Sequence, residues 1–556
     1  MQLASCLMWP VERVCRFGRD ERGNISILAL SLMVATISIG GLALATMRYE
    51  QKRVLVQNAL DRCTLMAASL KQRLSPSDVV YDCMESARLR SAVKSVLVTD
   101  SGSIGGGANR TVDAVAETDI NALFPNVIGM QTLNVDARSV ATQKLSKIEI
   151  SLVLDVSSSM VGTKLTNLKT AAKEFVATVL NNDTDKRISI NLVPFSTQVN
   201  LGASLRSLYN ATYIHGQANV NCFDMPDSVY SALSLSRTLA MPMTGNVDAF
   251  TPTSSPNTYL SPTDIEYALP RTYTMPQLPN TVRGDNRTCP ALSANVVRVG
   301  QQNITTLQAQ IDGLIAAGST GIQTGLRWGL ALLDPGSQSV FTSLISSSAV
   351  PSNLAGRPLA YGELDAMKII VVMSDGANAS DYRLNDTYRT GLSPIYRAPD
   401  GNYSIYHAAQ TLATKYYIPL TNRWSATPYV PASGGTAVQQ TWPQVWAAMR
   451  MNYVVKQFYF RAFPTDPAYS MTNMMNTIRT IIPPTNADTQ QQAMCNLAKG
   501  QQVIVYSIAF EAPMSGKTKL SACASSPAHF FDATGTQISS AFRMIAKNIT
   551  QLKLTQ

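Results

Sequence analysis

The residues of this sequence that could bind a metal are carboxylates and hydroxyls placed directly after apolar segments. Asp155, Ser157 and Ser159 follow the apolar run 148–154 and precede a helical pattern that starts near Gly162. Carboxylate and hydroxyl oxygens are the ligands that hard divalent cations prefer, Mg²⁺ above all. The spacing therefore predicts a magnesium site at a turn between a strand and a helix.

A second acidic turn follows another predicted strand, 368–373. Asp375 lies there between Ser374 and Gly376. Open α/β sheets bind ligands at the carboxyl ends of their strands, so the two turns would face one site. The alternative is that the segment at Asp155 is only a helix cap, because Asp and Ser are favoured at caps. A second carboxylate turn in the same structural position favours the metal site.

Composition indicates a globular chain of several domains and argues against two functional classes. The 556 residues are 45% hydrophobic and 15% charged, which is typical of folded proteins. The net charge is +10, but the basic residues are scattered, so no nucleic-acid binding is expected. The chain has three histidines, which disfavours a zinc centre or a Ser-His-Asp triad.

Strands and helices alternate from residue 148 onward, which predicts a doubly wound parallel α/β sheet over residues 148–556. Two long stretches, 200–310 and 377–494, are rich in polar residues and lack helical periodicity. We expect them to be insertions on the surface of the sheet domain. The predicted strands are 148–154, 188–193, 368–373 and 503–510.

Residues 25–47 predict a single transmembrane helix because they are apolar or small throughout and uncharged. The tail 1–24 carries four arginines, which favours a cytoplasmic N-terminus, although basic residues also follow the span. A cleaved signal peptide is the alternative, but the apolar stretch is long and no small-x-small cleavage site follows it. The helical pattern continues beyond the membrane, and residues 48–147 are predicted as a helix followed by a small α+β stalk.

Cysteine positions favour an oxidising compartment. Of the eight cysteines, two precede the predicted span and six follow it. An even number on one side suits disulfides, although spacing alone does not establish connectivity and buried free thiols remain the alternative. Pairing between sequence neighbours would join Cys63 to Cys83, Cys222 to Cys289, and Cys495 to Cys523.

A threonine completes a pattern that resembles the von Willebrand factor A domain and its metal-ion-dependent adhesion site. Thr320 lies in a Gly-Ser-Thr-Gly turn before a helical run, with Thr324 nearby as the alternative hydroxyl. The resemblance implies that Ser157, Ser159 and Thr320 coordinate Mg²⁺, with Mn²⁺ or Ca²⁺ as alternatives. It also implies that Asp155 and Asp375 bind directly or through water. One position is left for a carboxylate of a protein partner.

The N-terminal part resembles the TadG-like proteins of bacterial tight-adherence (Flp) pilus systems. The resemblance lies in Gly23 before a small-apolar span, in the segment Gln57-Asn-Ala-Leu-Asp61, and in the ending that begins at Cys523. It implies an anchored pilus-assembly protein with a pilin-like helix. No Glu follows Gly23 at the spacing of processed prepilins, so we expect an uncleaved anchor.

Together these patterns predict a non-enzymatic protein of the bacterial inner membrane, with most of the chain in the periplasm. Its metal site would bind other pilus-assembly components. Three alternatives are a surface adhesin for host or matrix ligands, a metal-dependent hydrolase using Asp155 and Asp375, and a cytoplasmic partner of a AAA+ ATPase. The hydrolase would need a nucleophile or a second metal, and the six trailing cysteines disfavour the cytoplasm.

The topology can be tested with reporters fused after Gln556. A reporter active only in the periplasm should give signal, because the basic tail and the cysteines beyond the span both place residues 48–556 on the oxidising side. The matched control is a cytoplasm-only reporter at the same position, which should be silent. Activity of that control in place of the first would overturn the topology.

Overall fold

The structure is a computed structural model that describes most of the chain in two compact units, 1–145 and 146–555. The first 21 residues of the predicted tail, and residues 248–287 of the first predicted insertion, lie outside the described part. The described residues are 22–69, 74–101, 109–121, 131–144, 147–181, 183, 185–214, 216, 219–245, 247, 288–363, 366–449 and 451–555.

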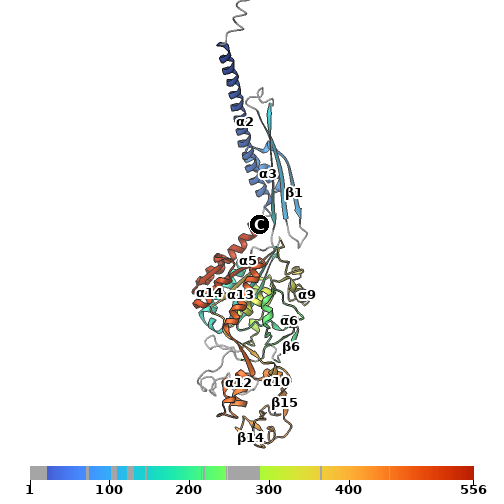
Figure 1. The fold of residues 1–556 in the computed structure, drawn as a ribbon. Helices are drawn as coiled ribbons and strands as arrows, with labels where there is room; N and C mark the ends of the chain where they lie inside the picture. The colour runs from blue at the N-terminus through green and yellow to red at the C-terminus, as the bar shows by residue number, and fades with distance from the viewer. Residues whose placement is uncertain are drawn as a thin grey trace, which may run out of the picture. The chain divides into compact units, whose positions relative to one another are not determined.

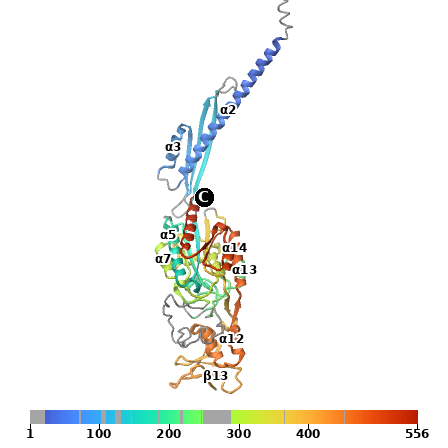
Figure 2. The same cartoon turned by 90° about the vertical axis from the view of Figure 1, so that its left-hand side faces the viewer.

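The first unit is built on one long helix, α2 (Arg22–Ala68). Its apolar N-terminal half gives it a mean hydropathy of 2.3 over an 18-residue window, and it is the one helix of the described chain long and apolar enough to cross a membrane. The remainder packs on a three-stranded antiparallel sheet and on α3 (Pro76–Ser86). Figures 1 and 2 show α2 lying along this sheet. The sheet order is β1 (Val93–Ser101), β2 (Asn109–Asn121) and β3 (Thr132–Lys144).

The core of the first unit is small and lies under one face of α2. Val56, Leu60, Cys63 and Ala67 recur at helical spacing and are fully buried against the sheet. A disulfide joins Cys63 to Cys83 of α3. Because a small core supplies little stability by itself, this covalent link reinforces the contact between the two helices.

The second unit contains a six-stranded sheet in which neighbouring strands are far apart in sequence. The order is β18-β17-β9-β4-β5-β8. The first five strands pair in parallel, and β8 adds an antiparallel edge. This topology confirms the predicted doubly wound α/β fold class. The strands are β4 (Lys147–Asp155), β5 (Ile188–Phe195), β8 (Arg298–Gln301), β9 (Ala366–Ser374), β17 (Ile504–Phe510) and β18 (Phe530–Ala533).

Helices cover both faces of this sheet, as Figure 2 shows for α5 and α7 on one side and α13 and α14 on the other. On the first side, the apolar stripe of α5 packs with α15, and Phe175 meets Phe542 edge to face at 5.8 Å between ring centroids. The first side has α5 (Thr163–Asn181), α7 (Ile304–Asp312) and α15 (Gln537–Thr555). The second has α8 (Ile322–Ala331), α9 (Gln338–Ser346), α13 (Pro484–Gly500) and α14 (Met514–Cys523).

Both insertions leave the sheet at the carboxyl ends of its strands, after β5 and after β9. The first contains α6 (Gly202–Arg206) and the short strands β6 (Ala211–Tyr213) and β7 (Met241–Pro242). The second opens and closes on the antiparallel pair β10 (Asp381–Leu384) and β16 (Arg479–Ile482).

Within the second insertion lies a five-stranded antiparallel sheet, seen at one end of the second unit in Figure 1. Its strands, in sheet order, are β14 (Arg423–Ser425), β13 (Tyr416–Ile418), β12 (Tyr403–Tyr406), β11 (Leu392–Arg397) and β15 (Val438–Thr441). The helices are α10 (Trp442–Ala448), α11 (Met451–Val454), a π-helical turn Val455–Phe460, and α12 (Met471–Ile478).

The predicted insertion limits at 310 and 494 are both too late in the chain. β8 and α7 belong to the sheet domain, so the first insertion ends before residue 298. α13 packs on α8 and β17 with Met494 fully buried, so the second ends before residue 484. The polar residues of α13 masked its amphipathic pattern, because few of its apolar side chains are large.

We predict that the disulfide between Cys495 of α13 and Cys523 of α14 stabilises the second face of the sheet. Replacing both cysteines by serine should cost about 3 kcal/mol, because the bond closes a loop with a sequence separation of 28 residues. Thermal unfolding of the full chain in detergent would show a lower melting temperature.

The matched control is Lys519→Ala, which removes a partly exposed ion pair to Asp488 between the same two helices. Its effect should stay within about 1 kcal/mol. Recovery of free thiols at both cysteines by non-reducing peptide mapping would contradict the prediction.

Candidate metal-binding site

Two neighbouring parallel strands deliver the carboxylates to one edge of the sheet. Leu154 of β4 pairs with Met373 of β9, so Asp155 and Ser374 end their strands at the same level. The Ser374 hydroxyl donates a hydrogen bond of 2.6 Å to Asp155 Oδ2. Asp155 is completely buried, and the side chain of Asp375 has 0% exposure. The register of the sheet therefore places two acidic side chains together out of solvent.

A chain of hydroxyls connects the two carboxylates. The Ser157 backbone N–H donates to Asp155 Oδ1 at 2.8 Å. Ser157 Oγ lies 2.9 Å from Ser159 Oγ, which donates to Asp375 Oδ1 at 2.7 Å. The turn between β4 and α5 thus presents both serine hydroxyls to the space between the aspartates.

Thr320, and not Thr324, brings the third hydroxyl. Thr320 Oγ1 donates to Ser157 Oγ at 3.2 Å. Thr324 Oγ1 instead donates to the carbonyl oxygens of Gly321, at 2.7 Å, and Thr197, at 3.1 Å. Its hydroxyl therefore serves the backbone at the start of α8. The structure brings together all five residues that the sequence proposed as ligands.

The electrostatics of the cluster suit a cation. Burial, together with the nearby Asp375 carboxylate, raises the pKa of Asp155 to about 7. Within the described residues, no group of three or more His, Cys, Asp or Glu side chains forms a metal site. This cluster has two carboxylates and three hydroxyls, an all-oxygen donor set that fits Mg²⁺, Mn²⁺ or Ca²⁺ better than zinc.

Sequence reasoning missed several side chains that support the ligands. Ser374 was visible only as a neighbour of Asp375. Asn378 accepts from the Ile322 N–H at 2.8 Å and donates to Gln491 of α13 at 2.8 Å, which ties the start of α8 to the loop after β9. Lys164 of α5 contacts Asp375 with 2.7 Å between Nζ and Oδ2. No sequence motif marked Asn378 or Lys164, because only the fold brings them to the site.

The loop after β5 forms hydrogen bonds with the turn that contains Thr320. Thr197 Oγ1 accepts from the Ser319 N–H at 3.0 Å, and the Ser196 carbonyl accepts from the Gly321 N–H at 2.8 Å. A Cβ atom at Gly321 would lie 2.3 Å from the Thr197 carbonyl oxygen. Glycine is therefore required for this close approach between two backbones.

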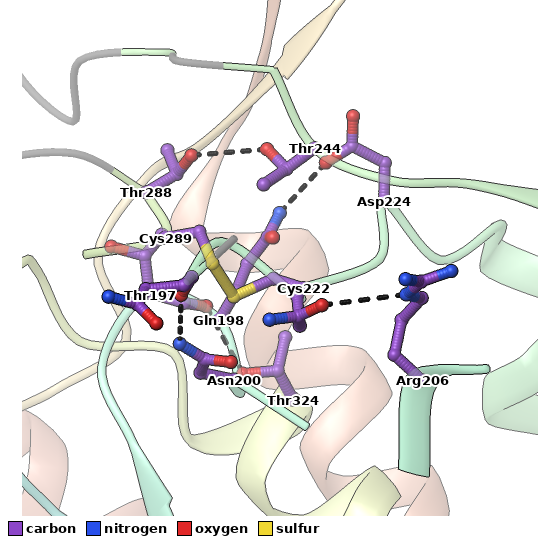
Figure 3. The surroundings of a disulfide bond; sticks show 12 residues. Thr197, Gln198, Asn200, Arg206, Cys222, Asp224, Thr244, Thr288, Cys289 and Thr324 are labelled. Atoms are coloured by element: carbon purple, nitrogen blue, oxygen red, sulfur yellow. Dashed lines mark hydrogen bonds between the residues drawn. A yellow bond between two sulfur atoms is a disulfide. The ribbon is translucent and has the colours of Figure 1, made fainter. Parts of the chain in front are cut away.

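The same loop connects the site to the first insertion, as Figure 3 shows around the disulfide between Cys222 and Cys289. Gln198, next to Thr197, donates to Asp224 Oδ1 at 2.9 Å. Both sulfurs are buried in a small cluster of their own. The disulfide therefore secures the insertion directly beside the loop that supports Thr320.

Comparison with known families concerns the N-terminal helix. Residues 23–70 match the Tad family model, described as Flp pilus-assembly TadE/G-like. The matched segment coincides closely with α2, and it is where the sequence suggested a tight-adherence protein. No curated protein sequence matches the chain.

Solved structures similar to the chain include pilus adhesins. For SpaC of Lactobacillus rhamnosus GG, identity is 12%, with 82% of this chain and 34% of SpaC covered and a TM-score of 0.29. For the vWF domain of the tip protein Mfa5 of Porphyromonas gingivalis, identity is 14%, with 73% of this chain and 96% of that domain covered and a TM-score of 0.29. For RrgA of Streptococcus pneumoniae, identity is 10%, with 82% of this chain and 49% of RrgA covered and a TM-score of 0.30. The chain thus spans about a third of SpaC and half of RrgA.

We predict that Gly321→Ala displaces Thr320 and weakens divalent-cation binding. The added methyl group overlaps the Thr197 carbonyl, so the turn must shift, with a destabilisation of about 1–3 kcal/mol. Gly313→Ala is the matched control, because its new Cβ would meet neighbouring atoms at an ordinary 3.5 Å. Titration of the full chain with Mn²⁺ checks the prediction. Equal affinities for the two variants would show that the Thr320 turn does not matter for the cation.

Proposed function

We propose that this protein is a membrane-anchored component of pilus assembly in the tight-adherence system, and that it binds a protein partner through a divalent cation. One observation carries the proposal. Five oxygen ligands from three separate segments converge at the carboxyl edge of the parallel sheet, linked by hydrogen bonds of 2.7–3.2 Å. The TadE/G-like match of residues 23–70 supports the assignment to pilus assembly.

The balance of ligands favours binding of an acidic partner. Three of the five donors are neutral hydroxyls, so the cation keeps much of its positive charge. Such an ion accepts one more hard oxygen readily, and a carboxylate from Asp or Glu is the simplest source. Mg²⁺ is the proposed ion, with Mn²⁺ and Ca²⁺ as alternatives. The metal then supplies binding geometry to the partner.

Localisation in the inner membrane, with the bulk of the chain in the periplasm, is part of the proposal. The uncharged half of α2 supports anchoring by a single span. The three disulfides among the described residues, two in the second unit and one in the first, support an oxidising compartment.

We propose a binding role without catalysis. The two described histidines are engaged elsewhere: His407 lies in an aromatic cluster with its Nε2 2.8 Å from the Phe458 carbonyl oxygen, and His529 Nδ1 lies 2.7 Å from Ser526 Oγ. A hydrolase would need a general base or a second metal beside the first. A phosphatase assay with the metal-loaded protein should therefore show no turnover.

The metal-dependent role is tested with Asp375→Ala and Ser157→Ala in the full chain. Loss of a ligand, or of the carboxylate that orients one, should weaken Mg²⁺ binding by about 10–100-fold and abolish cross-linking to other pilus-assembly proteins, while the sheet stays folded because its core lies elsewhere. EDTA should have the same effect on the unmodified protein. Asp532→Ala is the control, because that exposed carboxylate pairs with Lys517 away from the site.

The outcomes separate binding from a structural role of the metal. Unchanged cross-linking in both variants and in EDTA would overturn the adhesion function. A large fall in melting temperature, with cross-linking retained by the fraction that stays folded, would mean that the cation only joins the two turns.

A further inference from the structure

One oxygen of the Asp375 carboxylate forms an ion pair with a lysine. Lys164 lies in the first turn of α5, directly after the serine turn, and its Nζ is 2.7 Å from Asp375 Oδ2. The other oxygen, Oδ1, accepts the Ser159 hydroxyl at 2.7 Å. Both oxygens of this carboxylate therefore already have donors from the protein, while Lys164 itself remains 24% exposed.

A second carboxylate also lies near the Lys164 ammonium group. Glu511 directly follows β17, the neighbour of β9, and its Oε2 lies 3.9 Å from Lys164 Nζ. Its Oε1 accepts from the Gly535 N–H at 2.9 Å. Glu511 has a φ of 52°, a conformation uncommon for residues with a Cβ. The ammonium group thus lies between carboxylates from two adjacent strand ends.

We propose that Lys164 is a positioning residue of the metal site that keeps Asp375 from direct coordination, so that the cation retains charge for the partner's carboxylate. This inference rests on the proposed function and deepens it. A direct Asp375 ligand would bring a second full negative charge to the ion. With Asp375 held by Lys164 and Ser159, it acts through the Ser159 hydroxyl. Asp155 accepts only from neutral donors, the Ser374 hydroxyl and the Ser157 N–H, so its charge is the one left to neutralise the cation.

The position of Lys164 lowers the affinity for the metal and raises the affinity of the bound metal for an anionic partner. The ammonium group repels the divalent ion and also restrains a carboxylate that would attract it. Removing a single positive charge beside the site of a divalent cation should change the affinity for that ion by roughly tenfold. Affinity for the partner's carboxylate should fall when the lysine charge is removed, because a cation that is better neutralised by Asp375 attracts a further carboxylate less strongly.

The test uses Mn²⁺ alone with the full chain in detergent micelles. Lys164→Met removes the charge and keeps the length of the side chain. Calorimetry should show Mn²⁺ binding about tenfold tighter than in the unmodified protein. Water-proton relaxation by the bound Mn²⁺ should fall by the contribution of one water molecule, because Asp375 would take a coordination position. A purely structural lysine would give weaker binding and unchanged relaxation per bound ion.

Two controls accompany the variant. Lys164→Arg retains the charge and should restore the affinity and relaxation of the unmodified protein. Lys169→Met removes a charge from the same helix, where Nζ contacts the Asp312 carbonyl oxygen and no site residue, and should change neither. Lys164→Gln serves as the second uncharged variant, should the methionine variant fail to fold, and the same tighter binding is expected.

Each result has one meaning. Equal or weaker Mn²⁺ binding in the folded uncharged variants, with relaxation unchanged, overturns the role of Lys164. Absence of Mn²⁺ binding in the unmodified protein instead overturns the metal site itself. Tighter binding with lower relaxation, reversed by arginine, supports the proposal.

Discussion

The candidate metal site depends on two carboxylates held close together at the ends of neighbouring parallel strands. The register that pairs β4 with β9 puts Asp155 level with Ser374, the residue before Asp375, and both carboxylates are buried. Two negative charges in such a place repel each other and lose hydration, as the raised pKa of Asp155 shows. Serine and threonine hydroxyls, a backbone N–H and an ammonium group surround the pair. Every one of these groups donates a hydrogen bond, and together they offset part of the cost.

The same edge of the sheet is also where both insertions leave the domain. Because a parallel strand ends at the functional edge, any chain added after it must begin there. The first insertion is secured beside the site by the disulfide of Cys222 and Cys289 and by the contact of Gln198 with Asp224. The second begins two residues after Asp375. A partner that reaches the cation would therefore meet insertion surfaces as well, and these are suited to decide which partner fits.

The first unit is stabilised by the packing of one long helix on a small sheet. Its helix α2 is uncharged over a length that fits a bilayer, and its remainder needs a partner in water. The three-stranded sheet supplies that partner through a narrow stripe of small and branched side chains. A core of this size depends on the covalent link between Cys63 and Cys83. The apolar span and the candidate metal site thus lie in units with separate cores.

The sequence by itself determined the parts that follow from local pattern. Short apolar runs predicted the strands, and the carboxylates that follow them predicted the chemical class of the site. An uncharged apolar span predicted the long helix. Three of the candidate ligands were accessible because Asp155, Ser157 and Ser159 lie within five residues. The tertiary structure decided what depends on contacts between distant segments. It chose Thr320 over Thr324, assigned α13 to the sheet domain, and brought Lys164, Asn378 and Glu511 to the site. No local pattern marks those three side chains, because their positions result from strand order and from helices packed across more than 100 residues of intervening sequence.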